Sequence, residues 1–166
     1  MNNNKIGSLF FVHVLIILCC SSAIANENIE SKNIETLILW NEEVWCKGRV
    51  DLVSQLVAPS YTRHENQGTR SVTPSEYVLE ILALRKRNIE LFLPNDIGVD
   101  GNLIWTRWSM RADGPNGDKI TGRVLQTYRF KNGKLAETWL VFTAGEMWSK
   151  DEPFTSCNIS ELFKSR

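Results

Sequence analysis

The chain has little of several residues on which common functions depend. Among its 166 residues there are two histidines and four cysteines, too few to support a structural zinc site. Its 19 basic and 19 acidic residues give a formal net charge of +0, and no run of like charges interrupts that balance. Nucleic-acid binding is therefore not expected. We also expect no metal and no cofactor.

A long apolar run is missing from the chain except near its start. Lys5 is the only Lys, Arg, Asp or Glu before Glu27, residues 9–20 are almost wholly apolar, and residues 23–25 read Ala-Ile-Ala. A basic start, a short apolar core and small residues at a cleavage position are typical of a secretory signal peptide. The alternative is an uncleaved membrane anchor, although the run is short of the roughly 20 residues of a full span. We expect cleavage near Ala25 and an exported protein, periplasmic or secreted, without stable membrane insertion.

The cysteines divide between the leader and the remainder of the chain. Cys19 and Cys20 leave with the signal peptide, and Cys46 and Cys157 remain. In an oxidising compartment this pair can form a disulfide. The alternative is two unpaired thiols, one buried in each segment.

Helical patterns fill the first half of the mature chain. Apolar residues at helical spacing predict a helix over residues 34–48 and a shorter one over residues 52–57. Residues 73–76, Thr-Pro-Ser-Glu, form a capping box that starts a third helix, which extends to about residue 87. A polar stretch over residues 60–65 is expected to lead into a loop.

The second half of the chain has a period of two, which is typical of strands. Asn132-Gly133 is a strong signal for a tight hairpin between two of these strands. The expected strands are residues 89–94, 103–112, 119–131 and 134–144. Helices followed by hairpins predict one α+β domain over residues 26–166, in which three helices pack on a strongly curved antiparallel sheet. A polar tail begins at about residue 149.

Four short motifs occur in an order that resembles a known family. The first helix has a Trp followed by a Gly, and residues 56–64 read Leu-Val-Ala-Pro-Ser-Tyr-Thr-Arg-His. Residues 121–123 read Thr-Gly-Arg, and residues 130–139 read Phe-Lys-Asn-Gly-Lys-Leu-Ala-Glu-Thr-Trp. Over roughly residues 33–148 the chain resembles the SnoaL-like polyketide cyclase family of the nuclear transport factor 2-like superfamily.

This resemblance implies a cone-shaped α+β barrel with a pocket at its open end. Members include aldol-type cyclases, isomerases, dehydratases, hydrolases and proteins without catalytic activity, and many form homodimers through the outer face of the sheet. Cyclases usually carry an Asp one or four residues after the Trp that corresponds to Trp139. Here those positions hold Leu140 and Thr143, which cannot act as a base at neutral pH.

His64 and Glu137 are the candidate catalytic residues. His64 is the only histidine after the leader, and an imidazole titrates near neutrality. Glu137 shares strand parity with Trp139 and Thr143, so all three face one side of the sheet. If that side is concave, Glu137 is a pocket carboxylate beside an aromatic wall. Otherwise it pairs with an arginine on the outer face, and His64 serves only a local hydrogen bond.

Several further residues are candidates for substrate binding. An inward arginine suits a carboxylate or enolate oxygen, and aromatic walls suit flat apolar ligands. Solvated charges and packing aromatics are the alternative explanation. The candidates are Tyr61, Trp105, Arg107, Arg123, Trp139 and Thr143.

Two hypotheses for function follow. In the first, an exported protein binds a small, partly apolar molecule such as a carbonyl compound, with or without acid/base chemistry by His64 and Glu137. In the second, the same fold is a non-catalytic carrier, dimerisation unit or interaction module. A cavity lined by both candidate catalytic residues favours the first hypothesis.

Overall fold

The computed structural model describes residues 28–93, 97–148, 154–155 and 157–164. The predicted signal peptide lies outside these residues. A helix over residues 28–39 continues into a π-helical segment, η1. The remaining elements are η2 (Val50–Leu52), α2 (Val53–Leu56), β1 (Val57–Glu65), β2 (Gly68–Val72), α3 (Pro74–Arg85), β3 (Glu90–Leu93), β4 (Ile97–Asp100), β5 (Leu103–Asp113), β6 (Lys119–Lys131), β7 (Lys134–Ala144), β8 (Phe154–Thr155) and α4 (Ile159–Lys164).

The first helix changes its winding at Trp40. Segment η1 covers Trp40–Cys46, and the Asn41 side chain donates a hydrogen bond to the Leu37 carbonyl oxygen at 2.9 Å. Gly48 follows with a φ of +79°, a left-handed conformation that glycine adopts without strain. The predicted stop at this glycine is confirmed. The π-helical winding turns Trp40 and Val44 into the core.

Helix α3 begins as the sequence predicts. The Thr73 hydroxyl accepts a hydrogen bond from the Glu76 backbone N–H, and the Glu76 carboxylate accepts one from the Thr73 backbone N–H. This reciprocal pair satisfies two backbone donors that the first turn leaves without partners. The helix buries Tyr77 and Ile81.

The sheet is open and largely antiparallel. Its strand order is β2-β1-β7-β6-β5-β3-β8, and β4 also pairs with β5. The Asn132-Gly133 turn between β6 and β7 has positive φ at both residues, 54° and 72°, as the hairpin signal requires.

Strand β1 departs from the expected pattern. It runs parallel to β7, which makes the sheet mixed, and it takes in residues expected to be polar loop. The buried side chains of β1 include Arg63 beside Tyr61, so no apolar alternation marked the strand. The helices and the curved sheet are confirmed, but the sheet is open instead of closing into a barrel.

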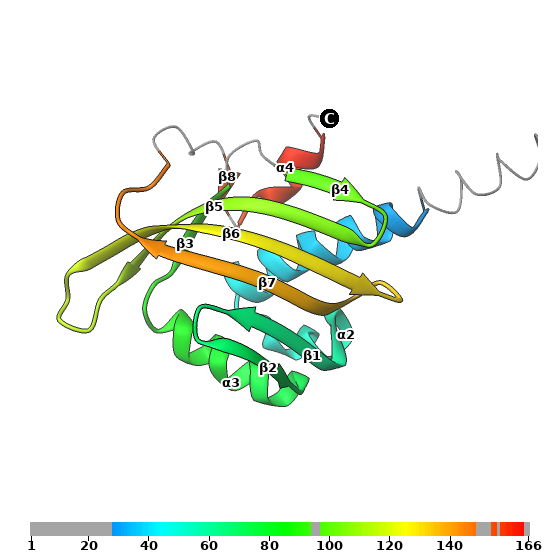
Figure 1. Ribbon diagram of the computed structural model, residues 1–166, viewed down its shortest axis with the longest axis horizontal. Helices are drawn as coiled ribbons and strands as arrows, with labels where there is room; N and C mark the ends of the chain where they lie inside the picture. The colour runs from blue at the N-terminus through cyan, green and yellow to red at the C-terminus, as the bar shows by residue number, and fades with distance from the viewer. Residues whose placement is uncertain (1–27, 94–96, 149–153, 156, 165–166) are drawn as a thin grey trace, which may run out of the picture.

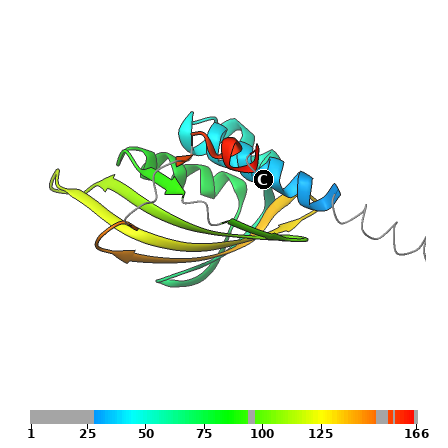
Figure 2. The same ribbon diagram turned by 90° about the horizontal axis from the view of Figure 1, so that it is seen from above.

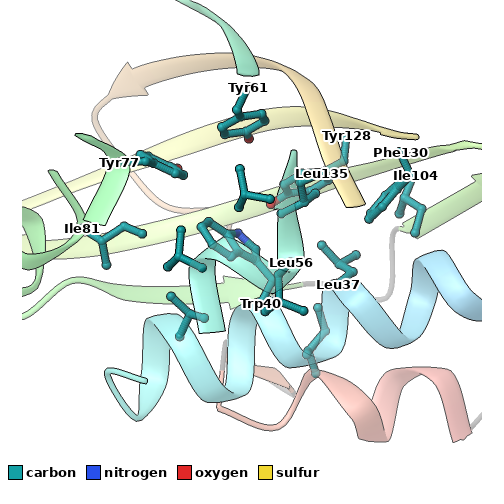
Figure 3. Close-up of a cluster of buried hydrophobic side chains, with 14 of the residues drawn as sticks. Leu37, Trp40, Leu56, Tyr61, Tyr77, Ile81, Ile104, Tyr128, Phe130 and Leu135 are labelled. Atoms are coloured by element: carbon teal, nitrogen blue, oxygen red, sulfur yellow. The ribbon is translucent and has the colours of Figure 1, made fainter. Parts of the chain in front are cut away.

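The molecule has two layers. Figure 2 shows the helices gathered on the concave face of the curved sheet, with the long strands β5, β6 and β7 extending beyond them. The core lies between the layers, where Trp40 and Leu37 meet the sheet residues Ile104 and Leu135 (Figure 3). We call this concave, helix-covered side the inner face and the opposite side the outer face.

The C-terminal segment returns to the helical layer. Cys157 forms a disulfide with Cys46, with 5.2 Å between their Cα atoms. The Ser160 backbone N–H donates to the Glu42 carboxylate at 2.8 Å, and Ile159 is fully buried. Cys157 and α4 therefore attach to η1 at the end of the first helix (Figure 1). Within the described part of the chain, no helix has the length and apolarity needed to cross a membrane.

Candidate functional site

A cavity of about 330 Å³ lies between the helices and the inner face of the sheet. Its volume is at the lower end of the range of small-molecule sites. Helix α3, segment η1 and strands β1, β3, β5, β6 and β7 all contribute to its wall. The lining residues are Trp40, Asn41, Trp45, Arg63, Glu65, Tyr77, Leu84, Arg87, Ile89, Leu91, Trp108, Met110, Ile120, Val124, Gln126, Tyr128, Leu140 and Phe142.

The cavity wall is mainly aromatic and aliphatic. The Tyr77 ring stacks on Trp40 with centroids 5.6 Å apart. Burial raises the pKa of Tyr77 to about 12 and raises the pKa of Tyr128 further above its ordinary value. Both hydroxyl groups are therefore protonated at neutral pH, so they can donate or accept hydrogen bonds but cannot act as bases.

Two charged residues of the cavity wall, Arg63 and Glu65, belong to a cluster of four charged side chains. We call Arg63, Glu65, Arg70 and Glu80 the charge cluster. Arg63 donates to Glu65 and, at 3.1 Å, to Glu80. Arg70 donates to Glu65 at 3.2 Å and to Glu80 at 2.7 Å. The hydrogen bond from Arg70 lowers the pKa of Glu80. Each arginine thus contacts both glutamates, and the cluster has no net charge.

The charge cluster also lines a second hollow. This hollow measures about 410 Å³ and lies between the β1–β2 hairpin, α3 and β7. Arg63, Glu65, Leu84, Leu140 and Phe142 line both spaces. Arg63 and Glu65 of the cluster therefore line both the second hollow and the inner cavity.

Nε of Arg63 is buried and has no hydrogen-bond partner among the described residues. The indole of Trp108 is also buried and interacts with the Tyr128 side chain. Arg63 and Trp108 are 6% and 1% exposed. Arg63 also stacks over the Tyr77 ring, with 4.2 Å between its Cζ atom and the ring centroid.

The candidate catalytic residues are close together, but they lie on the outer face. Nε2 of His64 is 2.8 Å from Oε1 of Glu137, and its Nδ1 is 2.8 Å from Oγ1 of Thr69. The His64 ring stacks on Trp139 with centroids 5.1 Å apart. Arg129 donates to the other carboxylate oxygen of Glu137 at 2.5 Å and lies over the Trp139 ring. This is the arginine pairing given above as the alternative for Glu137.

The candidate binding residues also lie away from the cavity. Arg107 and Arg123 both lie over the Trp148 ring, at 4.8 Å and 5.0 Å from its centroid. Trp105 is 52% exposed on the outer face, where Thr143 pairs with Arg123 across the sheet. Tyr61 points inward but is packed in the core at 1% exposure.

None of the eight candidate residues is among those that line the cavity. Tyr61 is packed in the core, and strand parity is the reason for the others, because residues next to several of them along the chain face inward instead. Arg63 precedes His64, Trp108 follows Arg107, and Leu140 follows Trp139. The placement differs from the expectation of a pocket beside His64 and Glu137, and their catalytic role stays a prediction.

Leu140 occupies an informative position in the cavity wall. It is one of the two positions at which the family resemblance leads us to expect an aspartate. The position does face the cavity, but an apolar side chain occupies it. Thr143, the other position, has its partner on the outer face.

The comparisons with known proteins agree with this fold. The family model of the SnoaL-like polyketide cyclases matches residues 35–144. A candidate polyketide cyclase from Acidithiobacillus ferrooxidans shares 23% identity at a TM-score of 0.59, covering 69% of this chain and 89% of that one. A candidate SnoaL-like polyketide cyclase from a Jannaschia species shares 16% identity at a TM-score of 0.60, covering 69% and 87%.

An LEH-like epoxide hydrolase from M. tuberculosis has a similar fold. It shares 15% identity at a TM-score of 0.56, covering 69% of this chain and 84% of that one. No curated protein matches the sequence significantly. Identities this low support the fold and leave the chemistry to the residues of the cavity.

Proposed function

The chain belongs to the SnoaL-like polyketide cyclase family, and we propose that it binds a small, largely apolar molecule in the inner cavity. The observation that carries this proposal is the cavity itself, about 330 Å³ between aromatic helix residues and the concave sheet. An apolar molecule that enters it leaves water, and each Å² of buried apolar surface contributes about 25 cal/mol.

The lining residues favour binding over acid/base catalysis. Glu65 is the one carboxylate among the described residues that line the cavity, and two arginines hold its two oxygens. The tyrosine hydroxyls are protonated at neutral pH, and Leu140 stands where a cyclase carries a carboxylate. A general base must reach the proton that it removes. The only carboxylate among the described residues of this wall, Glu65, already accepts hydrogen bonds from two arginines.

Calorimetric titration with 2-ethylnaphthalene tests the proposal. We expect saturable binding to the wild-type protein and its loss in Leu140→Trp, because the larger side chain fills the cavity. Val141→Trp is the matched control, since Val141 is the next residue and is 56% exposed on the outer face. Absence of binding to the wild type, or equal binding to both variants, would contradict a ligand site in this cavity.

A second candidate function is acid/base chemistry at His64. The observation that favours it is the hydrogen-bonded series Thr69–His64–Glu137, with 2.8 Å on each side of the imidazole. A carboxylate that orients an imidazole beside a hydroxyl is the arrangement of a general base. Exchange of the methyl hydrogens of 2-acetonaphthone in deuterated water tests it. Acceleration by the wild type that His64→Gln abolishes would support this second function.

We further propose that the chain is exported and that residues 1–25 are removed. The Cys46–Cys157 disulfide supports export, because disulfides persist in oxidising compartments. The mass of the intact protein recovered from an expressing cell tests the proposal. Protein that retains its first 25 residues would contradict cleavage near Ala25.

A homodimer through the outer face is the last part of the proposal. Trp105, Leu125 and Val141 are 52%, 55% and 56% exposed on that face, and exposed apolar side chains from adjacent strands favour association. Sedimentation of the wild type and of Leu125→Glu tests it. We expect a dimer for the wild type and a monomer for the variant, and a monomeric wild type would contradict it.

A further inference from the structure

The disulfide lies in the wall of a third hollow, which measures about 260 Å³. Both Cys46 and Cys157 line this hollow. Cys157 is exposed, and Cys46 is half-buried. A small molecule in the hollow therefore meets the disulfide while the protein is folded.

A positive charge lies beside the disulfide. Arg85 lines the third hollow and donates to the Cys46 carbonyl oxygen at 3.1 Å. Glu90, the carboxylate among the described residues of this hollow, pairs with Arg111 at 2.6 Å. A nearby arginine stabilises a thiolate, so this position favours a cysteine sulfur as leaving group when the disulfide is attacked.

The third hollow also adjoins the inner cavity. Trp45, Ile89 and Leu91 line both spaces, and we call these three residues the side wall. Trp45 belongs to η1, Leu91 belongs to β3, and Ile89 directly precedes β3. Trp45 also packs edge-on against Trp40 of the inner cavity, with ring centroids 6.0 Å apart. A single layer of side chains therefore separates the disulfide hollow from the proposed ligand site.

The C-terminal segment joins the two elements that carry the side wall. We call residues 154–155 and 157–164 the C-terminal strap, which Figure 2 shows against the first helix. Cys157 attaches the strap to η1 covalently, and β8 pairs with β3. The strap therefore holds η1 and β3 together at the side wall.

The other contacts of the strap are individually weaker than the disulfide. They include the short β3–β8 ladder, the hydrogen bond from Ser160 to Glu42, and the buried side chains Ile159 and Leu162. A peripheral segment with few hydrogen bonds opens at a lower free energy than the central strands of a sheet. Loss of the disulfide should therefore loosen the strap and the side wall while β5, β6 and β7 stay folded.

We propose that a small thiol enters the third hollow, reduces the Cys46–Cys157 disulfide in the folded protein and thereby opens the side wall, so that the ligand of the inner cavity exchanges faster. The thiolate bonds to one cysteine sulfur, the bond between the cysteines breaks, and the other sulfur leaves as a thiolate. A second thiol displaces the first. The products are two cysteine thiols, which take up the protons of the two thiols, and one small-molecule disulfide.

This proposal rests on the ligand binding proposed above and adds its regulation. The disulfide persists in an oxidising compartment and is lost where thiols are abundant. The ligand is therefore held while the protein is oxidised and released more readily after reduction.

Reduction without denaturant tests the first step, with glutathione as the thiol and alkylation followed by mass measurement as the readout. Leu135→Ala is the control. Leu135 is fully buried and lines neither the third hollow nor the inner cavity, so the variant weakens the whole fold without touching the strap. We expect wild type and Leu135→Ala to be reduced at rates within about threefold of each other. Faster reduction of Leu135→Ala than this, or no reduction of the folded wild type, would overturn the proposal.

Ligand exchange tests the second step. The fluorescence of 2-ethylnaphthalene follows its dissociation after dilution of the complex. Dissociation should be at least about tenfold faster from the reduced wild type than from the oxidised wild type. Cys46→Ser/Cys157→Ser should match the reduced wild type with or without glutathione, and oxidised Leu135→Ala should match the oxidised wild type. A smaller acceleration on reduction, or the same acceleration in oxidised Leu135→Ala, would overturn the proposal.

Hydrogen exchange shows where reduction loosens the protein. We expect faster exchange in α4, β8, β3 and η1, with the protection of β6 and β7 retained. Loss of protection throughout the reduced protein would show that the disulfide acts only on overall stability, and this would overturn the proposal. Failure of the two proposals is distinguishable, because no binding of 2-ethylnaphthalene to the oxidised protein removes the proposed function, whereas binding at a redox-independent rate removes only the regulation.

Discussion

Strands β1, β5, β6 and β7 carry aromatic and charged side chains on both faces of the sheet, and these side chains have different surroundings on the two faces. On the inner face, Trp108, Tyr128 and the buried Arg63 border a cavity. On the outer face, His64, Glu137 and Trp139 satisfy one another by hydrogen bonds and ring stacking. The inner face therefore borders a space that a ligand can fill, whereas the aromatic and charged side chains of the outer face pack on one another.

The largest expected effect concerns the disulfide that joins the C-terminal segment to η1 in the helical layer. The Cys46–Cys157 disulfide spans a sequence separation of 111 residues. Cys157→Ser should lower the free energy of unfolding by about 4 kcal/mol, because the unfolded chain regains the freedom of a long loop. Denaturant unfolding measures this. Reductant should have the same effect on the wild type and none on Cys46→Ser/Cys157→Ser, and a wild type insensitive to reductant would contradict the bridge.

The next comparison sets one leucine on each face. Leu135 is 0% exposed and Leu125 is 55% exposed. Leu135→Ala should lower the free energy of unfolding by about 3 kcal/mol, since it leaves a cavity in the core. In the monomer, Leu125→Ala should change it by less than about 0.5 kcal/mol. Both losses are measured at a protein concentration at which the wild type sediments as a monomer, and equal losses there would contradict the comparison.

Ion pairs on the two faces should also differ in how much they contribute to the free energy of unfolding. Arg63 is 6% exposed and holds Glu65 and Glu80, whereas the Arg129 side chain is 45% exposed beside Glu137. Arg63→Met should destabilise the protein by about 2 kcal/mol, because Glu65 loses a buried partner. Arg129→Met should cost less than about 1 kcal/mol. Thermal unfolding at two salt concentrations checks this, and a larger loss for Arg129→Met would reverse the comparison.

The smallest expected effect is a dependence on pH at the charge cluster. The hydrogen bond from Arg70 lowers the pKa of Glu80 below its ordinary value of 4.5. A carboxylate with a lowered folded-state pKa stabilises the protein above its unfolded pKa, and this stability is lost as the pH falls through the folded value. Glu80→Gln should therefore reduce stability at pH 7 more than below pH 4, by under about 1 kcal/mol because solvent screens a side chain that is 32% exposed. Unfolding curves at both pH values measure it, and an equal loss at both would contradict the pairing.

The sequence predicted the elements that local chemistry determines. The capping box at Thr73 and the hairpin at Asn132-Gly133 each depend on a few neighbouring residues, and both are present. Strand β1 escaped prediction because it buries Arg63, and its parallel pairing with β7 joins segments far apart in the chain. Only the folded sheet brings these two strands together.

The candidate site was harder to predict for a geometric reason. Spacing along a strand shows which residues share a face, and Glu137, Trp139 and Thr143 do share one. Spacing does not show which face the helices cover, so the inward neighbours Trp108 and Arg63 were missed. The position of Leu140 was a usable signal, since the resemblance placed a functional residue there.

A crystal structure of the protein with 2-acetonaphthone tests most directly whether the inner face is the functional one. We expect the ring system in the inner cavity, in contact with Trp40, Tyr77 and Leu140. A ligand bound instead against His64 and Trp139 on the outer face, with the inner cavity empty, would contradict this assignment.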